Sequence, residues 1–346
     1  MDLSKENNDL RVAIISDLHF GITSNNKIVE KKTCQWLKKS FFPFIKKNNI
    51  NNIIFAGDLF HNRKAINTES GLNVVKYFIN LLPSNIYTYI IPGNHDAFYN
   101  DNVSVNSPYL LMHDKKNIIV VDEIMTIGNL HMTLFPWGTK PGGDYINGCY
   151  AVGHFDIIGA LMNNNITCQK GLKTSDFSGY EHVFSGHYHM PSVIENIEYV
   201  GNPIEQNWSE INFDHQFIVL NVGSGKREYI KTSEAYKIFY KVLFESNTPD
   251  IEFNAKDTVV KIVAGESVDY GSLIQYRDKL IDEGAIDVKI IESSKKCDVL
   301  EDDIDYELLS IVDMINCYID DNIDVDDKDK KVLKKLTDKL YNGVDS

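Results

Sequence analysis

The sequence predicts an α/β protein in which a body with two sheets is followed by a smaller second unit. Over the first 95 residues, short β-branched runs alternate with segments of helical spacing, a pattern typical of a parallel sheet with helical crossovers. Further short apolar runs with shorter links predict a second sheet. Around Ala235 the pattern restarts. We therefore expect a four-layer sandwich of two mixed sheets flanked by helices, with a small α+β cap domain and a helical C-terminal tail.

The elements of the body follow from hydrophobic spacing. Strands are expected at 11–16, 52–56 and 86–91, with helices over 27–48 and 69–82 between them. The later apolar runs predict strands at 118–121, 131–135, 150–153, 182–185, 198–200 and 216–222. Their shorter links place them in the second sheet.

The last third of the chain predicts two further parts. Strands are expected at 237–244, 258–263 and 285–291, and a helix at 270–283. Beyond these lie two amphipathic stretches, from Ile304 to Ile315 and from Val332 to Leu340. We expect residues 1–233 to form the main domain, 234–296 a cap, and 297–346 an acidic helical tail.

Composition limits the class of protein. A chain of 346 residues with 43% hydrophobic and 24% charged residues is typical of folded domains and excludes disorder throughout. The five cysteines are odd in number and never closer than 19 positions, which excludes CxxC motifs and disfavours a secreted disulfide framework. No apolar run approaches a membrane span, and the first residues lack a signal-peptide core. The expected location is the cytoplasm, which is the host cytoplasm if a phage encodes the protein.

The net charge of −14 argues at first against a polyanionic substrate. The acidity is local, however, because the segment from position 298 to 329 contains thirteen Asp and Glu residues and only one basic residue, Lys328. The N-terminal body is nearly neutral. Charge alone therefore does not decide the partner.

Five short polar motifs each follow a predicted strand. They are Asp17-Leu18-His19, Gly57-Asp58-Leu59-Phe60-His61, Gly93-Asn94-His95-Asp96, Gly153-His154 and Gly186-His187-Tyr188-His189. In open α/β sheets, ligands bind beyond the carboxyl ends of the strands, so these motifs are expected to converge. Carboxylate, imidazole and amide groups without thiolate suit manganese, iron or zinc better than a soft metal.

The number of candidate ligands favours two ions. The set comprises Asp17, His19, Asp58, Asn94, His154, His187 and His189. A single tetrahedral ion needs only three or four protein ligands. Seven are enough for two ions if one carboxylate bridges them, and Asp58 is the natural bridge. Such a pair can serve a phosphoryl transfer by acting on both the attacking and the leaving oxygen.

The ordered motifs resemble those of the calcineurin-like metallophosphoesterases over residues 11–223. Within that superfamily the chain is most similar to the SbcD-type double-strand-break-repair nucleases, especially the phage recombination endonuclease subunits that act with an SbcC-type ATPase. The narrower resemblance rests on residues 16–21, 57–63, 92–96 and 153–156. It implies the metallophosphoesterase form of the sandwich described above.

The resemblance also implies roles for the motif residues. One metal would be held by Asp17, His19, Asp58 and His189, and the second by Asp58, Asn94, His154 and His187. The expected cofactors are two Mn²⁺ ions, with Mg²⁺ or another divalent ion as the alternative.

Three further residues receive catalytic roles from the same resemblance. His95 would donate a proton to the leaving oxygen, and Asp96 would orient His95. A histidine oriented by a carboxylate is a natural general acid near neutral pH. His61 would help to place the scissile nucleotide.

The function implied is DNA cleavage in recombination, repair and replication. The expected activities are a 3′–5′ exonuclease on duplex DNA and an endonuclease on single strands. The tail would bind the ATPase, and the nuclease domain would form a homodimer through the helices predicted over 27–48 and 69–82. Two alternatives stay open: a phosphatase or cyclic-nucleotide phosphodiesterase acting on a non-DNA substrate, and a non-catalytic DNA-tethering scaffold.

Other features have plainer interpretations. Arg63 and Lys64 closely follow a ligand motif, so they are candidate DNA contacts at the rim of the site. The run from Val222 to Lys226 lacks the first glycine and the Ser/Thr of a phosphate loop, and predicts a hairpin turn. Four histidines outside the motifs are expected to be structural or solvated: His113, His131, His182 and His215.

Overall fold

The computed structural model describes residues 10–22, 27–142, 150–162, 166–245, 249–265, 268–292, 319 and 327–342. The chain divides into two compact units. The first contains the chain up to Gln206 together with Glu210–Phe239 and Lys256–Val259. The second contains Asn207–Ser209, Tyr240–Ala255 and the chain from Val260 onward.

The first sheet contains six strands in the order β12-β11-β1-β2-β3-β4. These are β1 (Arg11–Ile15), β2 (Asn52–Phe55), β3 (Tyr87–Ile90), β4 (Ile118–Val120), β11 (Gln216–Asn221) and β12 (Arg227–Lys231). β1, β2 and β3 are parallel as predicted, and β4 is parallel to β3, whereas β11 is antiparallel to both β1 and β12. The assignment of β4 and β11 to the second sheet was wrong. The length of a connecting segment does not show which strand is the neighbour. Here β4 pairs with β3, and β11 pairs with β1.

The second sheet also contains six strands, in the order β5-β6-β7-β8-β10-β9. They are β5 (Met125–Ile127), β6 (Met132–Phe135), β7 (Tyr150–His154), β8 (His182–Gly186), β9 (Ser192–Ile194) and β10 (Ile197–Tyr199). The four strands β6, β7, β8 and β10 are parallel, and the two outer strands are antiparallel to their neighbours. Both sheets are therefore mixed, which confirms the expected fold class.

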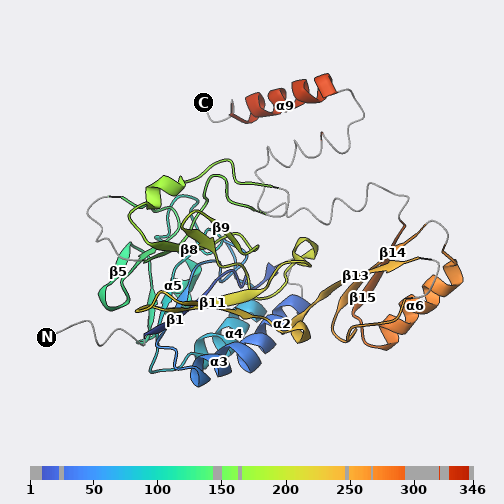
Figure 1. Cartoon of the computed structure of the whole chain (residues 1–346), viewed down its shortest axis with the longest axis horizontal. Coiled ribbons are helices and arrows are strands. Elements are labelled where there is room, and N and C mark those ends of the chain that lie inside the picture. The colour runs from blue at the N-terminus through green and yellow to red at the C-terminus, as the bar shows by residue number, and fades with distance from the viewer. Residues whose placement is uncertain are drawn as a thin grey trace. The chain divides into compact units, whose positions relative to one another are not determined.

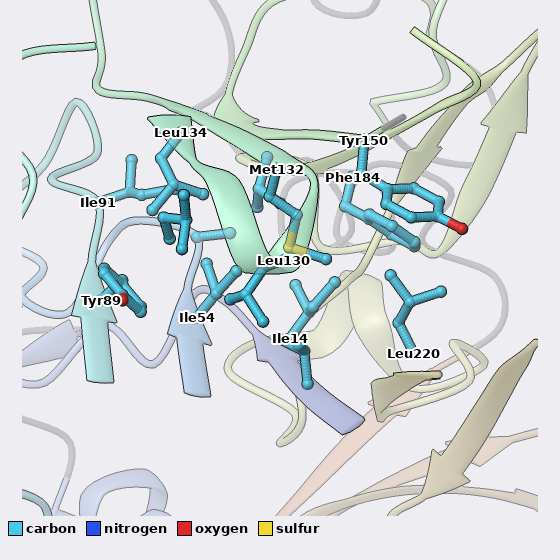
Figure 2. Close-up of a cluster of buried hydrophobic side chains, with 14 of the residues drawn as sticks. Ile14, Ile54, Tyr89, Ile91, Leu130, Met132, Leu134, Tyr150, Phe184 and Leu220 are labelled. Carbon is cyan, nitrogen blue, oxygen red and sulfur yellow. The ribbon is translucent and has the colours of Figure 1, made fainter. Parts of the chain in front are cut away.

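The main core lies between the two sheets. Alternate residues of the first sheet, such as Ile14 and Ile54, face Met132, Leu134 and Phe184 of the second (Figure 2). All five side chains are fully buried. Because the side chains of a strand alternate between its faces, the remaining residues of the first sheet point the other way.

Helices cover that other face of the first sheet (Figure 1). They are α2 (Lys27–Trp36), a π-helical turn (Leu37–Phe41), α3 (Phe42–Lys47) and α4 (Thr68–Tyr77). Phe217 of β11 lies 5.1 Å from the ring of Phe41 and 6.1 Å from that of Trp36. The single helix predicted over 27–48 is interrupted, because Pro43 at the start of α3 cannot donate to the helical ladder. α5 (Ser107–Met112), capped by Asn106, was not predicted.

The second unit has its own small core. The strands β13 (Phe239–Phe244), β14 (Val259–Ala264) and β15 (Asp287–Glu292) form one sheet, and α6 (Tyr270–Asp282) accompanies it. Buried residues of these elements form a separate hydrophobic cluster. α9 (Asp327–Asn342) matches the second amphipathic stretch of the tail, and the first lies outside the described residues. Within the described residues, no helix has both the length and the apolar character that crossing a membrane requires.

Candidate metal centre

The polar motifs converge where the strands of the two sheets end. Asp17 and His19 follow β1, Asp58 follows β2, His154 ends β7, and the motif after β8 supplies His187 and His189. Potential ligand atoms lie within 4.8 Å of one another in three groups of three; His19, His61 and His95 form a partly buried group, and the other two groups are fully buried. Of the fully buried groups, the first is Asp17, His19 and His189, and the second is Asp58, His154 and His187.

Strained backbone marks the same residues. The φ angles of Asp17, His19, Asp58 and His187 are 56°, 43°, 60° and 94°. Non-glycine residues rarely adopt this left-handed region, and such strain clusters at functional sites. Four of the eight described non-glycine residues with positive φ belong to this centre, so the surrounding fold holds these side chains in place.

Glycines allow the motifs to approach one another. A Cβ atom on Gly57 would lie 2.1 Å from Nδ1 of His154, and one on Gly93 would lie 2.1 Å from Oδ1 of Asp58. Neither position accepts a side chain without displacing a candidate ligand. Four of the five polar motifs begin with a glycine, and at Gly57 and Gly93 that glycine has a steric cause.

Asp58 lies between the two groups. Its Oδ2 is 3.5 Å from Nε2 of His19 and 3.2 Å from Nε2 of His154. Its Oδ1 accepts the backbone N–H of His95 at 2.9 Å, which fixes the carboxylate. In the first group, Nε2 of His189 lies 3.2 Å from Nε2 of His19. Asp58 therefore lies close to histidines of both groups, and its role as a bridge between two ions stays a prediction.

The second group contains an amide and a buried nitrogen without a partner. Oδ1 of Asn94 lies 2.9 Å from Nε2 of His154. Nδ1 of His187 is buried and has no hydrogen-bond partner in the described part of the chain. A buried nitrogen in this state is costly unless something binds it. The mixed oxygen and nitrogen donors around it suit a divalent cation of intermediate hardness.

Outer acceptors orient three of the histidines. Nδ1 of His189 lies 2.6 Å from Oε1 of Glu210, and Nε2 of His187 lies 2.8 Å from Oδ1 of Asp156. Nδ1 of His154 bonds to the carbonyl of Ala56 at 2.8 Å. Each acceptor engages one ring nitrogen and leaves the other directed into the centre. Metal-binding histidines are commonly oriented in this way.

Glu210 belongs to a wider polar network that supports the first group. Its Oε2 accepts a hydrogen bond from Nδ2 of Asn202 at 2.7 Å and from the backbone N–H of Gln206 at 2.9 Å. Nε2 of Gln206 in turn donates to the carbonyl oxygen of Asp17 at 2.6 Å. One loop therefore positions both His189 and the backbone of Asp17.

Two of these supporting residues were missed from the sequence for different reasons. Asp156 follows His154 by two positions, so its place beside a ligand motif was an available signal. Glu210 lies 21 positions beyond His189 in a segment without a motif. Only the folded loop brings Glu210 to the centre.

The pKa values of the candidate ligands shift in different directions. Burial raises the pKa of Asp17 and lowers that of His19 well below its ordinary value. Burial also raises the pKa of Asp58, but the neighbouring His154 and His95 outweigh it and hold that pKa well below its ordinary value. Burial lowers the pKa of His154, yet Asp58 beside it raises the net value to about 9. A cation entering this group therefore competes with a proton.

His95 and Asp96 differ from expectation in their contacts. Nδ1 of His95 lies 2.6 Å from the carbonyl oxygen of His61. The Asp96 carboxylate instead accepts the backbone N–H groups of Leu59, Phe60 and Gly93 at 3.0 to 3.1 Å. None of these contacts joins Asp96 to the His95 ring, and the orienting role of Asp96 stays a prediction. Its buried carboxylate joins the loops that carry the ligands, because their turns leave amide groups without other acceptors.

The remaining candidates lie at the edge of the centre. The ring of His61 stacks on that of His95 at 5.3 Å, and its Nδ1 lies 3.3 Å from Nδ1 of His19. Arg63 is partly exposed and donates a hydrogen bond to Oδ1 of Asn100. Lys64 is exposed.

Several known proteins are similar to this chain. The chain is 22% identical over 342 residues to exonuclease subunit 1 of Enterobacteria phage T4, covering 96% of this chain and 98% of that protein. Among solved structures, an archaeal phosphodiesterase matches 64% of this chain and 99% of its own at 12% identity, with a TM-score of 0.31. The Pseudomonas putida nuclease MPE matches 65% of this chain and 74% of its own at 15% identity, with a TM-score of 0.30.

The family assignment rests on a match to a sequence model of the family. The sequence model described as calcineurin-like phosphoesterase matches residues 10–191, which is more than half of the chain. The matched region contains the polar motifs and both groups of candidate ligands. The protein therefore belongs to the calcineurin-like phosphoesterases, a family of metallophosphoesterases.

Proposed function

We propose that this protein is a two-metal DNA phosphodiesterase that acts as a subunit of a nuclease complex. The observation that carries the proposal is the position of Asp58 between two buried groups of ligands. Two cations held on either side of one carboxylate suit a displacement at phosphorus. The proposed activities are a 3′–5′ exonuclease on duplex DNA and an endonuclease on single strands.

The proposed ligand sets share Asp58. Asp17, His19 and His189 would complete one set, and Asn94, His154 and His187 the other. Mn²⁺ is the proposed ion, with Mg²⁺ or another divalent ion as the alternative, because oxygen and imidazole donors are mixed and no thiolate takes part. When bound, the two cations supply activation of a water and neutralisation of phosphoryl charge.

His95 is the proposed proton donor to the leaving oxygen. A carbonyl oxygen only accepts hydrogen bonds, so the bond to His61 keeps the proton on Nδ1 of His95. Nε2 is then the ring nitrogen that gains and loses a proton during turnover. The stacked ring of His61 holds this geometry, and Arg63 and Lys64 are proposed contacts to the DNA backbone.

The DNA substrate and the partner are proposed from the relative in phage T4. That protein is named an exonuclease subunit, and the match spans nearly all of both chains. We propose an SbcC-type ATPase as the partner and residues 297–346 as the segment that binds it. Val332 and Leu336 of α9 are 58% and 50% exposed and lie one helical turn apart, as a docking face requires. Dimerisation is proposed through the helical segments 27–48 and 69–82, which contain α2, α3 and most of α4.

The test is cleavage of end-labelled linear duplex DNA by the purified chain with Mn²⁺. His95→Ala and His187→Ala should each lose cleavage, by at least about 100-fold for a lost general acid. His113→Ala is the matched control, because His113 is exposed and lies outside both ligand groups. It should cleave like the wild type.

The other outcomes separate the alternatives. Hydrolysis of a small phosphodiester without DNA cleavage, even after an SbcC-type partner is added, would favour a phosphatase or cyclic-nucleotide phosphodiesterase. Full function of the ligand variants in cells would favour the tethering scaffold. Either result would reject the nuclease.

A further inference from the structure

An exposed apolar surface lies next to the metal centre. Phe98 and Tyr99, just beyond the motif that carries His95, are 44% and 46% exposed, and Val105 is 52% exposed. The two rings meet edge to face at 5.1 Å. The backbone N–H of Phe98 donates to the carbonyl oxygen of Val105, so the three side chains come from adjacent backbone. Clustered exposed apolar groups of this kind mark interaction sites more often than isolated ones do.

Trp137 connects this surface to the candidate ligands. Its Nε1 donates to the carbonyl oxygen of Asn100 at 3.0 Å. Its ring lies 5.5 Å from that of His187 and 5.9 Å from that of His154. A Cβ atom on the neighbouring Gly138 would lie 2.4 Å from the carbonyl oxygen of Asp101, so the two loops pack closely. Trp137 therefore links the loop that carries Phe98 and Tyr99 to the second ligand group.

A positive charge accompanies the aromatic groups. Arg63 donates to Oδ1 of Asn100, in the same loop as Phe98 and Tyr99. Across the described residues, none of the ion pairs includes Arg63. A neutral amide holds the guanidinium in place without cancelling its charge. Exposed aromatic faces beside an uncompensated cation are the combination that binds single-stranded nucleic acid, because bases stack and phosphates pair with the cation.

We propose that Phe98, Tyr99 and Trp137 form a platform on which unpaired bases next to the scissile phosphate stack, with Arg63 holding the backbone. This inference rests on the proposed nuclease function and names its substrate class as single-stranded DNA or a frayed duplex end. The alternative occupant of the surface is a protein partner, and the experiment below separates the two.

The test measures KM and kcat for cleavage of a single-stranded oligonucleotide with Mn²⁺. The double variant Phe98→Ala/Tyr99→Ala should raise KM by about 10- to 100-fold, in the range of base–aromatic stacking. Its kcat and its hydrolysis of bis(p-nitrophenyl) phosphate should not change, because no ligand is touched. Tyr87→Ala is the matched control, since Tyr87 is 55% exposed at the start of β3 and belongs to neither ligand group.

An abasic oligonucleotide of the same length isolates the stacking contribution. Without bases, the wild type and the double variant should have the same KM. A double variant that keeps wild-type KM on the normal oligonucleotide would overturn the platform while leaving the nuclease intact. Loss of binding to the ATPase partner with an unchanged KM would assign the surface to protein docking instead. A wild type that cleaves small diesters but no DNA would reject the nuclease itself.

Discussion

At the scale of single residues, the hydrogen bonds around each histidine determine which nitrogen can face a cation. Glu210 accepts from Nδ1 of His189, whereas Asp156 accepts from Nε2 of His187. The two rings therefore present opposite nitrogens to the centre. Because the acceptors already fix the orientation of both rings, cation binding requires no further loss of side-chain entropy from them. The supporting carboxylates should thus contribute to affinity without touching the ion.

The Glu210→Gln variant tests this contribution. The amide has only one acceptor oxygen, whereas the carboxylate serves His189 on one side and Asn202 with Gln206 on the other. We expect Mn²⁺ to bind about 10- to 100-fold more weakly at one of two sites, the usual cost of losing an outer partner. Calorimetric titration of the cation-free protein with Mn²⁺ resolves the two sites.

Glu205→Gln supplies the matched control for that titration. Glu205 is also a buried carboxylate of the same segment, but it accepts from the backbone of Ile238 and Phe239. Its variant should bind Mn²⁺ like the wild type. Equal losses in both variants would mean that the loop responds to any substitution, and would contradict a specific role for Glu210.

At the scale of elements, the ionisation of Glu205 makes the stability of the segment around Ile238 and Phe239 depend on pH. Both oxygen–backbone bonds are 2.9 Å long and fix the segment that enters β13. Burial raises the pKa of Glu205 to about 7, although these two N–H groups act in the opposite direction. The folded state therefore favours the protonated form. Its stabilising contribution is complete below the unfolded pKa of 4.5 and is lost as the pH rises through about 7.

The Glu205→Gln variant should accordingly weaken the pH dependence of stability. It cannot ionise, so the decline in its free energy of unfolding between pH 5 and 8 should be smaller than in the wild type, by up to about 3 kcal/mol. Urea unfolding in EDTA at several pH values measures both slopes without bound cations. Parallel slopes for the two proteins would show that Glu205 keeps an ordinary pKa in the fold.

The elements that the sequence predicted share strong local patterns. β1, β2 and β3 are β-branched runs that are buried on both faces, and their parallel order follows from the helices between them. β5 and β9 contain only three residues each, too few for a period to appear. The sheet to which a strand belongs depends on pairing between residues far apart in the sequence, such as Ile14 and Ile218. The local spacing of apolar residues does not predict such pairs.

The candidate site divides in the same way. The candidate ligands could be selected from the sequence because each follows a strand inside a short motif, and the ends of the strands meet. The contacts of Asp96 were not predictable, since its acceptor role depends on where the amides of Leu59 and Phe60 point after folding. Trp137 carries no motif at all, yet its ring lies beside His187. The motif residues can be recognised from local sequence, whereas the residues that position them become apparent only in the folded structure.

At the scale of the whole molecule, charge and apolar surface are distributed unequally. The acidic run between positions 298 and 329 accounts for most of the net charge of −14, which leaves the N-terminal body nearly neutral. A neutral body with Arg63 at its rim does not repel DNA strongly. The acidic segment would repel DNA, so the proposed partner of the tail is a protein that offers basic and apolar surface. α9 provides the apolar part through Val332 and Leu336.

Removal of residues 298–346 should therefore abolish association with an SbcC-type ATPase while Mn²⁺ binding stays at the wild-type level. A sharper variant is Val332→Asp/Leu336→Asp, which keeps the chain length and places charge on the exposed apolar face of α9. We expect at least a tenfold loss of affinity for the ATPase, because desolvating two carboxylates in an interface is costly. Lys331→Ala/Lys335→Ala is the control on exposed positions of the same helix. Calorimetry or co-purification measures association, and wild-type affinity in the aspartate variant would remove α9 from the interface.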